Sequence, residues 1–213
     1  MRASLRPRVR NFKTVVLGNA GVGKCSLIHT FLTINTTDHK TGFVPPPTVG
    51  VDYLPLMVRS SDGQSEAKLV LWDTAGSEKF RALIPAYVRD AQAVLCVFDL
   101  TNRVSFDAIS EWVAFVEANA ASTVHLHLIG NKCDTEIVPV VTDQEIAHLQ
   151  STLKFRSFTK VSAITGEGVA AIFAQIAEEA LTSHEHAAVQ IHSRVKLAKE
   201  PKATHHIQSA CAC

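Results

Sequence analysis

The sequence predicts an α/β domain whose six-stranded, mostly parallel sheet contains one antiparallel strand and carries helices on both faces. The main observation is that apolar runs of strand length alternate with helical patterns along most of the 213 residues, an order typical of parallel sheets. In addition, the run at 93–100 is strongly apolar, as expected of a strand that helices cover on both sides. A short polar turn between 51–58 and 66–72 predicts a hairpin, and hence the antiparallel strand.

The first half of the chain supplies three strands and one helix. Residues 12–18 form an apolar strand that ends in glycine, and residues 25–31 follow as a helix. The hairpin strands at 51–58 and 66–72 flank the turn-forming run Ser-Ser-Asp-Gly-Gln-Ser. Because Pro55 has no backbone N–H to donate, the first hairpin strand is expected at an edge of the sheet.

The second half alternates three strands with three helices. Apolar residues at helical spacing predict a helix over 105–120. Thr142, followed by Glu145, forms a capping box that opens a helix to about residue 152. The last helix is expected at 169–181. The strands of this half are expected at 93–100, 124–130 and 155–160.

The chain is expected to form one domain at 12–181, with a basic arm at 1–11 and a flexible tail at 182–213. The net charge of +1 argues against a protein that coats nucleic acid. No apolar run approaches the roughly 18 residues that a membrane helix needs, and the basic N-terminus lacks the apolar core of a secretory signal. The three internal cysteines show no paired spacing, which suits a reducing cytosol.

A glycine-rich loop lies between the first strand and the first helix. Its glycines would let backbone N–H groups close around a polyphosphate, and the helix N-terminus adds the positive end of a dipole. Lys24 would place a cation on the β- and γ-phosphate oxygens. The alternative is a glycine-rich connector without a ligand, which the strand–loop–helix setting disfavours. The candidate nucleotide-binding residues here are Gly18, Asn19, Ala20, Gly21, Val22, Gly23, Lys24, Cys25 and Ser26.

A second motif, Asp73 to Gly76, follows the strand at 66–72. Asp73 is placed to hold a water bound to Mg²⁺, and Gly76 can offer its N–H to a γ-phosphate. Thr48 lies upstream and would complete the metal shell. The candidate metal-binding positions are Cys25, Thr48 and Asp73, and the candidate catalytic positions are Thr48, Gly76 and Ser77.

A third motif, Asn131 to Asp134, directly follows the strand at 124–130. An Asp carboxylate accepts both the N1–H and the exocyclic amine of guanine, whereas adenine has neither donor on that edge. After the sixth strand, Ala163 offers a backbone N–H for the guanine oxygen. Cys133 is interpreted as a small filler. The candidate residues for base binding are Asn131, Lys132, Asp134, Ser162, Ala163 and Ile164.

With these motifs, residues 12–181 resemble a Rab-type member of the Ras-like small GTPases, which have a P-loop G domain. The segments TVGVDY (48–53), LWDTAG-x-EKFRALIPAYVRDA (71–91) and VFDLTN (97–102) are similar to Rab-specific sequences, and residues 84–90 resemble the subgroup that acts at the Golgi. The resemblance implies a GTP/GDP switch in vesicular transport that uses Mg²⁺. It also implies exchange factors, GTPase-activating proteins, effectors and prenyl-binding escort proteins of the GDI type as partners.

Two positions depart from the pattern of this family. Cys25 replaces the Ser or Thr whose hydroxyl ligates Mg²⁺, an ion that demands oxygen ligands and gains little from a thiol. Ser26 does not replace that ligand, because one residue along a helix turns the side chain by about 100°. Ser77 replaces the glutamine that orients the attacking water. We therefore expect weakened Mg²⁺ and GTP binding, and hydrolysis slower than the roughly 10⁻⁴ to 10⁻³ per second of unassisted relatives.

These departures need not abolish turnover, because the activating proteins of Rab relatives supply both an arginine and a glutamine in trans. Three further differences concern the nucleotide pocket. Ala20 stands where Ras has a glycine, and Ile164 replaces a lysine, which should loosen the outer wall of the base pocket. Phe43 is a candidate for covering the guanine edge, although its spacing from Thr48 differs from the family norm.

The chain ends in Cys211-Ala-Cys213, with Ala210 at the position where a CaaX box would have its cysteine. The ending resembles the Cys-x-Cys of Rab proteins, in which both thiols carry geranylgeranyl groups. Two lipid chains anchor a protein firmly where one does not, at about 0.8 kcal/mol per buried CH₂. The resemblance thus implies a location on the cytoplasmic face of an intracellular membrane, Golgi or endosomal, with cycling through the cytosol. The alternative is a terminus with two idle thiols.

Two other functions remain alternatives. Cys25 and Ser77 favour a Rab-like interaction scaffold that does not hydrolyse GTP and acts in one nucleotide state or in none. A P-loop ATPase or kinase is disfavoured by the Asn131–Asp134 motif. His125 and His127 lie on one face of a strand and are interpreted as packed or rim residues, and the histidines of the tail as part of a solvated linker.

Overall fold

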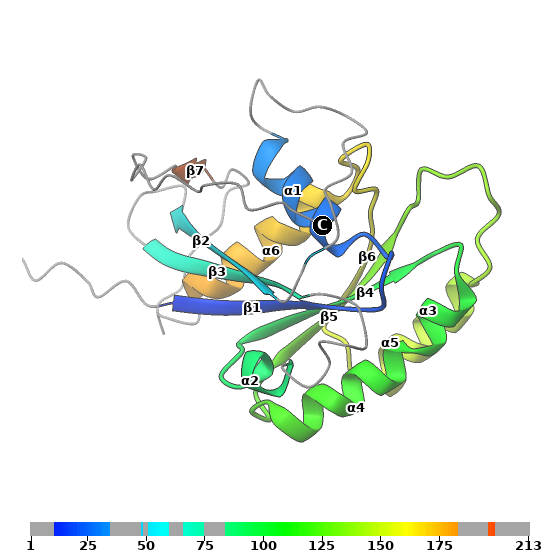
Figure 1. The fold of residues 1–213 in the computed structure, drawn as a ribbon, viewed down its shortest axis with the longest axis horizontal. Helices are drawn as coiled ribbons and strands as arrows, with labels where there is room; N and C mark the ends of the chain where they lie inside the picture. Colours follow the sequence, from blue (N-terminus) through cyan, green and yellow to red (C-terminus); the bar gives the residue numbers. More distant parts are fainter. Residues whose placement is uncertain are drawn as a thin grey trace, which may run out of the picture.

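The computed structural model describes residues 11–34, 48, 51–59, 66–74, 84–182 and 196–198. Its centre is a seven-stranded sheet with the strand order β6-β5-β4-β1-β3-β2-β7 (Figure 1). The strands are β1 (Asn11–Leu17), β2 (Val51–Arg59), β3 (Glu66–Thr74), β4 (Ala93–Asp99), β5 (His125–Asn131), β6 (Ser157–Lys160) and β7 (Lys196–Ala198). The helices are α1 (Lys24–Thr33), α2 (Ile84–Val88), α3 (Arg103–Asp107), α4 (Ile109–Asn119), α5 (Asp143–Thr152) and α6 (Val169–Thr182).

The sheet confirms the fold class. Strand β1 lies in the middle and pairs in parallel with β3 on one side and β4 on the other. Strands β5 and β6 extend the parallel part beyond β4. The hairpin strand β2 runs antiparallel to β3. Because the parallel strands end at one edge of the sheet, the loops that follow them are brought together there.

A seventh strand differs from the six that were expected. Strand β7 comes from the segment that the sequence analysis assigned to a flexible tail, and it pairs antiparallel with Met57–Arg59 of β2. A three-residue strand has no hydrophobic alternation to reveal it, so the sequence gives no signal for it. At Pro55, β2 pairs with Val70 of β3 alone among the described residues. The expected edge position is therefore found at Pro55 itself, but it is wrong for the strand as a whole, because β7 lies outside β2 at Met57–Arg59.

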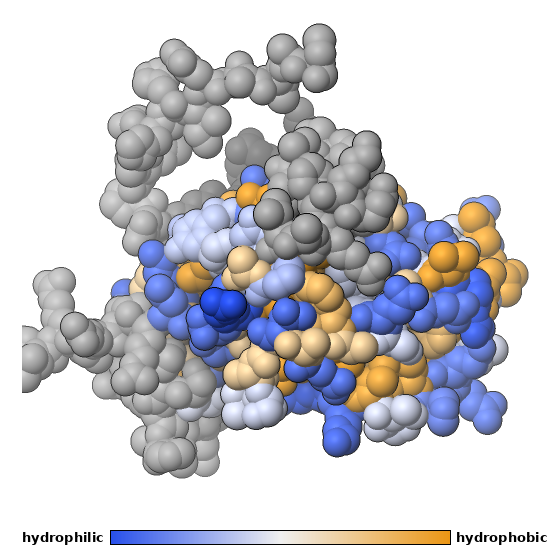
Figure 2. All heavy atoms as spheres, turned by 60° about the horizontal axis from the view of Figure 1, so that its bottom comes forward, coloured by the Kyte–Doolittle hydropathy of each residue, from blue (hydrophilic) through white to orange (hydrophobic). Residues whose placement is uncertain are grey.

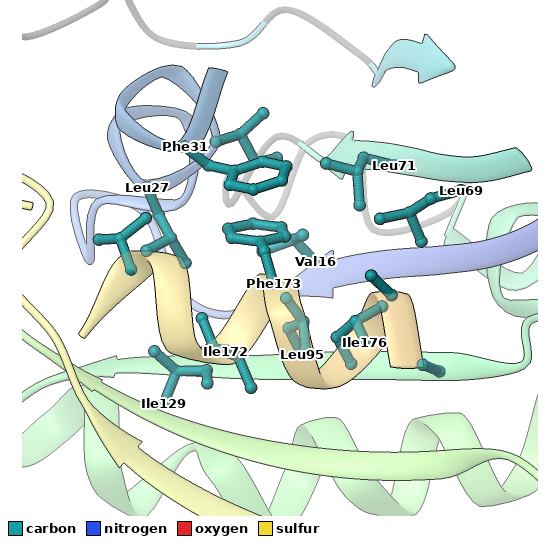
Figure 3. Close-up of a cluster of buried hydrophobic side chains, with 14 of the residues drawn as sticks. Val16, Leu27, Phe31, Leu69, Leu71, Leu95, Ile129, Ile172, Phe173 and Ile176 are labelled. Carbon is teal, nitrogen blue, oxygen red and sulfur yellow. The ribbon is translucent and has the colours of Figure 1, made fainter. Parts of the chain in front are cut away.

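The helices cover both faces of the sheet (Figure 1). One core lies between the sheet and helices α1 and α6, and it includes the stacked rings of Phe31 and Phe173, whose centroids are 3.9 Å apart (Figure 3). A second core lies on the other face, against α2 to α5. Neighbouring residues of β1 divide between them, with Val16 in the first core and Val15 in the second. This division is the two-sided burial that the apolar strands predict.

Helix boundaries agree with the sequence in most places. Helix α5 begins with the expected capping box, in which Thr142 and Glu145 exchange hydrogen bonds. The prediction of one helix over 105–120 is wrong in its bounds. The helical segment starts at Arg103 and consists of two helices, α3 and α4. The side chain of Asn102 accepts from the N–H of Ser105 and so fixes the earlier start. Ala108, between the two helices, keeps helical angles (φ −69°, ψ −14°).

The surface on the side that Figure 2 presents is mostly hydrophilic, with apolar side chains interspersed. No helix in the described part of the chain is both long and apolar enough to cross a bilayer.

Candidate functional site

The glycine-rich loop connects the carboxyl end of β1 to helix α1, as expected. Its first glycine approaches the neighbouring strand closely, because a Cβ at Gly18 would lie 2.2 Å from the carbonyl oxygen of Val97. Gly23 has φ +95° and directly precedes α1, where its carbonyl accepts from the N–H of Leu27 at 2.9 Å. The loop therefore turns sharply onto a helix N-terminus, a geometry that suits an anion.

Lys24 is held at this loop by its own backbone. Its side chain is buried, and Nζ donates to the carbonyl oxygens of Gly18 and Asn19 at 2.9 Å each. Burial lowers the pKa of Lys24, and the nearby charge of Asp73 partly offsets that effect. The ammonium of Lys24 thus lies inside the curve of the glycine-rich loop, where a bound polyphosphate would contact it.

Asn131 links the phosphate side of the site to the base side. This buried residue ends β5, and its Nδ2 donates to the carbonyl oxygen of Val22 at 2.7 Å. Its Oδ1 accepts from the N–H of Ala163, after β6, at 3.0 Å. The three segments that the sequence assigned to a single site are therefore joined by one side chain.

The loop after β6 is held by hydrogen bonds on its buried side and is exposed to solvent on its other side. Ser162 is fully buried, and its Oγ accepts from the N–H groups of Ile164 at 3.2 Å and Thr165 at 2.9 Å. The carbonyl of Ala163 accepts from Thr30 of α1 at 2.5 Å. Ile164 is 43% exposed, as expected of the outer wall of a pocket.

Lys132 and Asp134 follow Asn131 with different surroundings. Nζ of Lys132 lies 2.7 Å from Oδ2 of Asp99 at the end of β4. Burial raises the pKa of Asp99, but hydrogen bonding to Lys132 and Thr101 outweighs it, so the net shift is downward. Asp134 is exposed, which leaves its carboxylate accessible to a base.

Three donor atoms for a metal converge beside α1. Sγ of Cys25 lies 2.5 Å from Oγ1 of Thr48, which donates to Oδ2 of Asp73 at 3.0 Å. Burial raises the pKa of both Cys25 and Asp73. Oδ1 of Asp73 is buried and has no hydrogen-bond partner among the described residues. The two oxygen donors suit Mg²⁺, but the sulfur does not, so the set as a whole fits that ion poorly.

Two residues of the site escaped the sequence analysis. Trp112 of α4 donates from Nε1 to Oδ1 of Asn19 at 2.9 Å, which ties the glycine-rich loop to a helix 93 positions away. Asp99 pairs with Lys132, as described above. The helical spacing of Trp112 indicated only a core residue, and Asp99 was noted only as part of the VFDLTN segment (97–102), with no role in the site. Both contacts depend on tertiary structure.

Several predicted residues lie outside the described ranges. These include Gly76, Ser77, Phe43, Cys211 and Cys213, and the histidines of the tail. His125 and His127 are described, and both lie against Glu179 of α6, with His127 fully buried. Their interpretation as packed or rim residues is confirmed. Within the described ranges, no group of three or more His, Cys, Asp and Glu side chains is arranged to hold a metal ion.

Comparison with known proteins identifies the family. The model of the Ras family matches residues 13–182. Rab-4A of Bos taurus is 33% identical over 178 residues, which cover 82% of this chain and 76% of the relative. Rab-39 of Caenorhabditis elegans is 35% identical over 172 residues, with coverages of 79% and 72%. Rab-26 of Bos taurus is 35% identical over 195 residues, with coverages of 87% and 71%. The chain therefore belongs to the Ras family and is a Rab-type small GTPase.

Proposed function

We propose that this chain is a GTP/GDP-binding switch in membrane traffic whose own hydrolysis is slow. Membership of the Rab-type GTPases carries the general part of this proposal. The observation that supports the site best is the pair of hydrogen bonds at Asn131, which donates to the carbonyl of Val22 and accepts from the N–H of Ala163. One buried side chain thereby couples a phosphate-binding loop to a base-binding loop, as a nucleotide that touches both would require.

In this function the base is read by Asp134 and Ala163. The exposed carboxylate of Asp134 would accept from the N1–H and the exocyclic amine of guanine. The N–H of Ala163, which donates to Oδ1 of Asn131 in this structure, would share its proton with the guanine oxygen. Adenine lacks both donors on that edge, so ATP should bind much more weakly than GTP. Lys24 contributes a charge to the phosphates, and the loop around it contributes backbone N–H groups. In relatives of this family a bound Mg²⁺ neutralises phosphate charge.

Hydrolysis is the weak part of the cycle. Ser77 is too short to orient a water as the glutamine of relatives does, so the chain depends on an activating protein for this contact. A Ser77→Gln variant should hydrolyse bound GTP faster than the parent chain in a single-turnover assay. Equal rates in the two proteins would refute the proposed defect.

Exchange of the acid at position 134 tests the base specificity. Asp134→Asn replaces one acceptor by a donor, which matches the 2-oxo group of xanthine in place of the 2-amino group of guanine. The variant should lose affinity for GDP and gain affinity for xanthosine diphosphate in competition with a fluorescent nucleotide. Glu136→Gln is the matched control, because it neutralises an exposed acid two residues away and should leave the preference for guanine unchanged.

A hydrolysis-deficient scaffold is the second candidate, and the sulfur of Cys25 beside Thr48 and Asp73 favours it. The nucleotide that copurifies with the protein separates the two functions when it is followed over time in Mg²⁺. Conversion of GTP to GDP supports the switch. Persistent GTP or a protein without nucleotide supports the scaffold.

Attachment to membranes is proposed through Cys211 and Cys213. In this view residues 12–181 form the switch, the arm at 1–11 precedes it, and residues 182–213 tether it to the cytoplasmic face of a Golgi or endosomal membrane. Exchange factors, activating proteins, effectors and escort proteins of the GDI type would act on it there and in the cytosol. Incorporation of labelled isoprenoid that disappears in a Cys211→Ser/Cys213→Ser variant tests this proposal.

A further inference from the structure

The donor atoms at the metal position come from three separate parts of the chain. Cys25 lies in the first turn of α1, Thr48 precedes β2, and Asp73 lies near the end of β3. Sγ of Cys25 contacts Oγ1 of Thr48, and that hydroxyl contacts Oδ2 of Asp73. The sulfur therefore takes part in the same cluster as the two oxygens and is not turned towards the core.

A second observation indicates that the cluster is built for a cation. Asp73 is only 4% exposed, yet its Oδ1 has no hydrogen-bond partner within the described part of the chain. A buried carboxylate oxygen without a partner is unfavourable, because it has lost its water and gained no hydrogen bond in exchange. The neighbouring ammonium of Lys24 does not fill this role, because its Nζ donates to the carbonyls of Gly18 and Asn19. A positive ion held between Asp73, Thr48 and Cys25 would supply the missing partner.

The chemistry of sulfur decides which ion fits. Mg²⁺ is a hard ion that requires octahedral oxygen ligation. Zn²⁺ accepts sulfur and oxygen together in small coordination shells, and sulfur ligands select for such softer ions. One sulfur and two protein oxygens, completed by phosphate oxygens, match that preference.

We propose that this site selects a thiophilic divalent cation of the zinc type over Mg²⁺ through a Cys25 sulfur ligand. The inference rests on the proposed function only in that the nucleotide phosphates complete the shell. It changes the role assigned to Cys25. The residue that weakens Mg²⁺ binding is in this view the ligand that determines which metal ion binds.

Two measurements on the full chain test this inference, with Cd²⁺ as the sulfur-seeking probe. The first is the ultraviolet charge-transfer band between sulfur and Cd²⁺, which needs no nucleotide. The second is the rate of release of fluorescent GDP in Mg²⁺, Zn²⁺ or Cd²⁺. All proteins carry Cys211→Ser/Cys213→Ser so that the tail thiols do not contribute. Cys25→Ser is the test variant, and Cys133→Ser is the matched control, because Cys133 is the other partly exposed thiol among the described residues.

The parent chain and Cys133→Ser should retain GDP longer in Zn²⁺ or Cd²⁺ than in Mg²⁺. Cys25→Ser should reverse this order, with a change in relative metal affinity of about tenfold or more, and should lose part of the charge-transfer band. An unchanged band and an unchanged order of metals in Cys25→Ser would overturn the inference. Failure of every variant to bind GDP would refute the proposed function instead, and the band of Cys25→Ser would still decide whether the sulfur is a ligand.

Discussion

The side chain of Asn131 and the backbone of Val22 are joined by a buried hydrogen bond of 2.7 Å, although 109 positions separate them. The bond passes beside Gly23, where an added Cβ would lie 2.2 Å from Nδ2 of Asn131. Gly23 is therefore required for two reasons. It permits the positive φ of the loop, and it leaves room for the amide that joins the loop to the base side of the site.

Two alanine substitutions separate these reasons. Gly21 and Gly23 both have positive φ, at +76° and +95°, but a Cβ at Gly21 would meet nothing within 4 Å. Gly21→Ala should lower the free energy of unfolding by about 1–2 kcal/mol, the cost of a left-handed alanine. Gly23→Ala should lower it by about 1–3 kcal/mol more, because it displaces a buried hydrogen-bonding group. Denaturant unfolding of the nucleotide-free proteins measures both.

The double variant Gly23→Ala/Asn131→Ala provides the control for this explanation. If the clash with Asn131 causes the additional loss, the double variant should be little worse than Asn131→Ala alone apart from the backbone strain. Full additivity of the two losses would mean that Gly23 acts without Asn131.

The contact between Trp112 and Asn19 gives a second prediction. Trp112→Phe removes the indole N–H and keeps an aromatic ring, so it tests the hydrogen bond with little loss of packing. In a cycle with Asn19→Ala, the coupling energy in unfolding should be about 0.5–1.5 kcal/mol, the net value of a neutral hydrogen bond. We also expect faster GDP release from Trp112→Phe, because the loop loses its contact with α4. A coupling energy of zero would show that the two residues act independently.

The parts of this site that the sequence predicted are those whose chemistry depends on local spacing. Seven consecutive residues from Gly18 to Lys24 define a loop that binds phosphate, because the backbone itself is the ligand. Asn131 was expected at the base side, yet its role as a bridge to Val22 depends on a neighbour far along the chain. Trp112 looked like any core residue of an amphipathic helix, since its spacing is the same whether or not Nε1 meets a loop.

The fold shows the same difference between local and distant information. Thr142 and Glu145 predict the start of α5, because a capping box is contained within four consecutive residues of the sequence. No periodic pattern in the sequence reveals that α3 and α4 are two helices in place of one. The pairing of β7 with β2 leaves no such pattern either. Hydrophobic periodicity thus predicted the layers of the domain, while side-chain contacts between layers determined the details of the site.

The capping box itself supports a third prediction. The N–H of Thr142 donates to Oε2 of Glu145 at 2.8 Å and, with the contact to Arg103, holds the pKa of Glu145 at about 2. Thr142→Ala removes the return bond from the N–H of Glu145 and should lower the free energy of unfolding by about 1 kcal/mol. Ser151→Ala, an exposed residue at the other end of α5, is the control and should change stability by less than about 0.5 kcal/mol. Equal effects would contradict a specific role of the cap.

Glu179 gives the last prediction, which concerns acid stability. This buried carboxylate of α6 contacts His125 at 2.8 Å and His127 at 3.3 Å through Oε2, and Arg156 at 3.2 Å through Oε1. Burial raises the pKa of Glu179, but hydrogen bonding to His127 and His125 and the charge of Arg156 outweigh it. The folded-state pKa of Glu179 therefore lies below 4.5, the ordinary value of a glutamate side chain.

A carboxylate whose pKa falls on folding stabilises the folded state above its unfolded-state pKa and loses that contribution as the pH falls through its folded-state pKa. Glu179→Gln should therefore be less stable than the parent chain at pH 7, and the difference should shrink as the pH is lowered below about 4.5. Glu178→Gln, an exposed neighbour on the same helix, should show no comparable change. Unfolding free energies measured from pH 7 downwards provide the comparison. A difference that stays constant over this range would mean that Glu179 acts through packing and not through its charge, because packing does not change when the carboxylate takes up a proton.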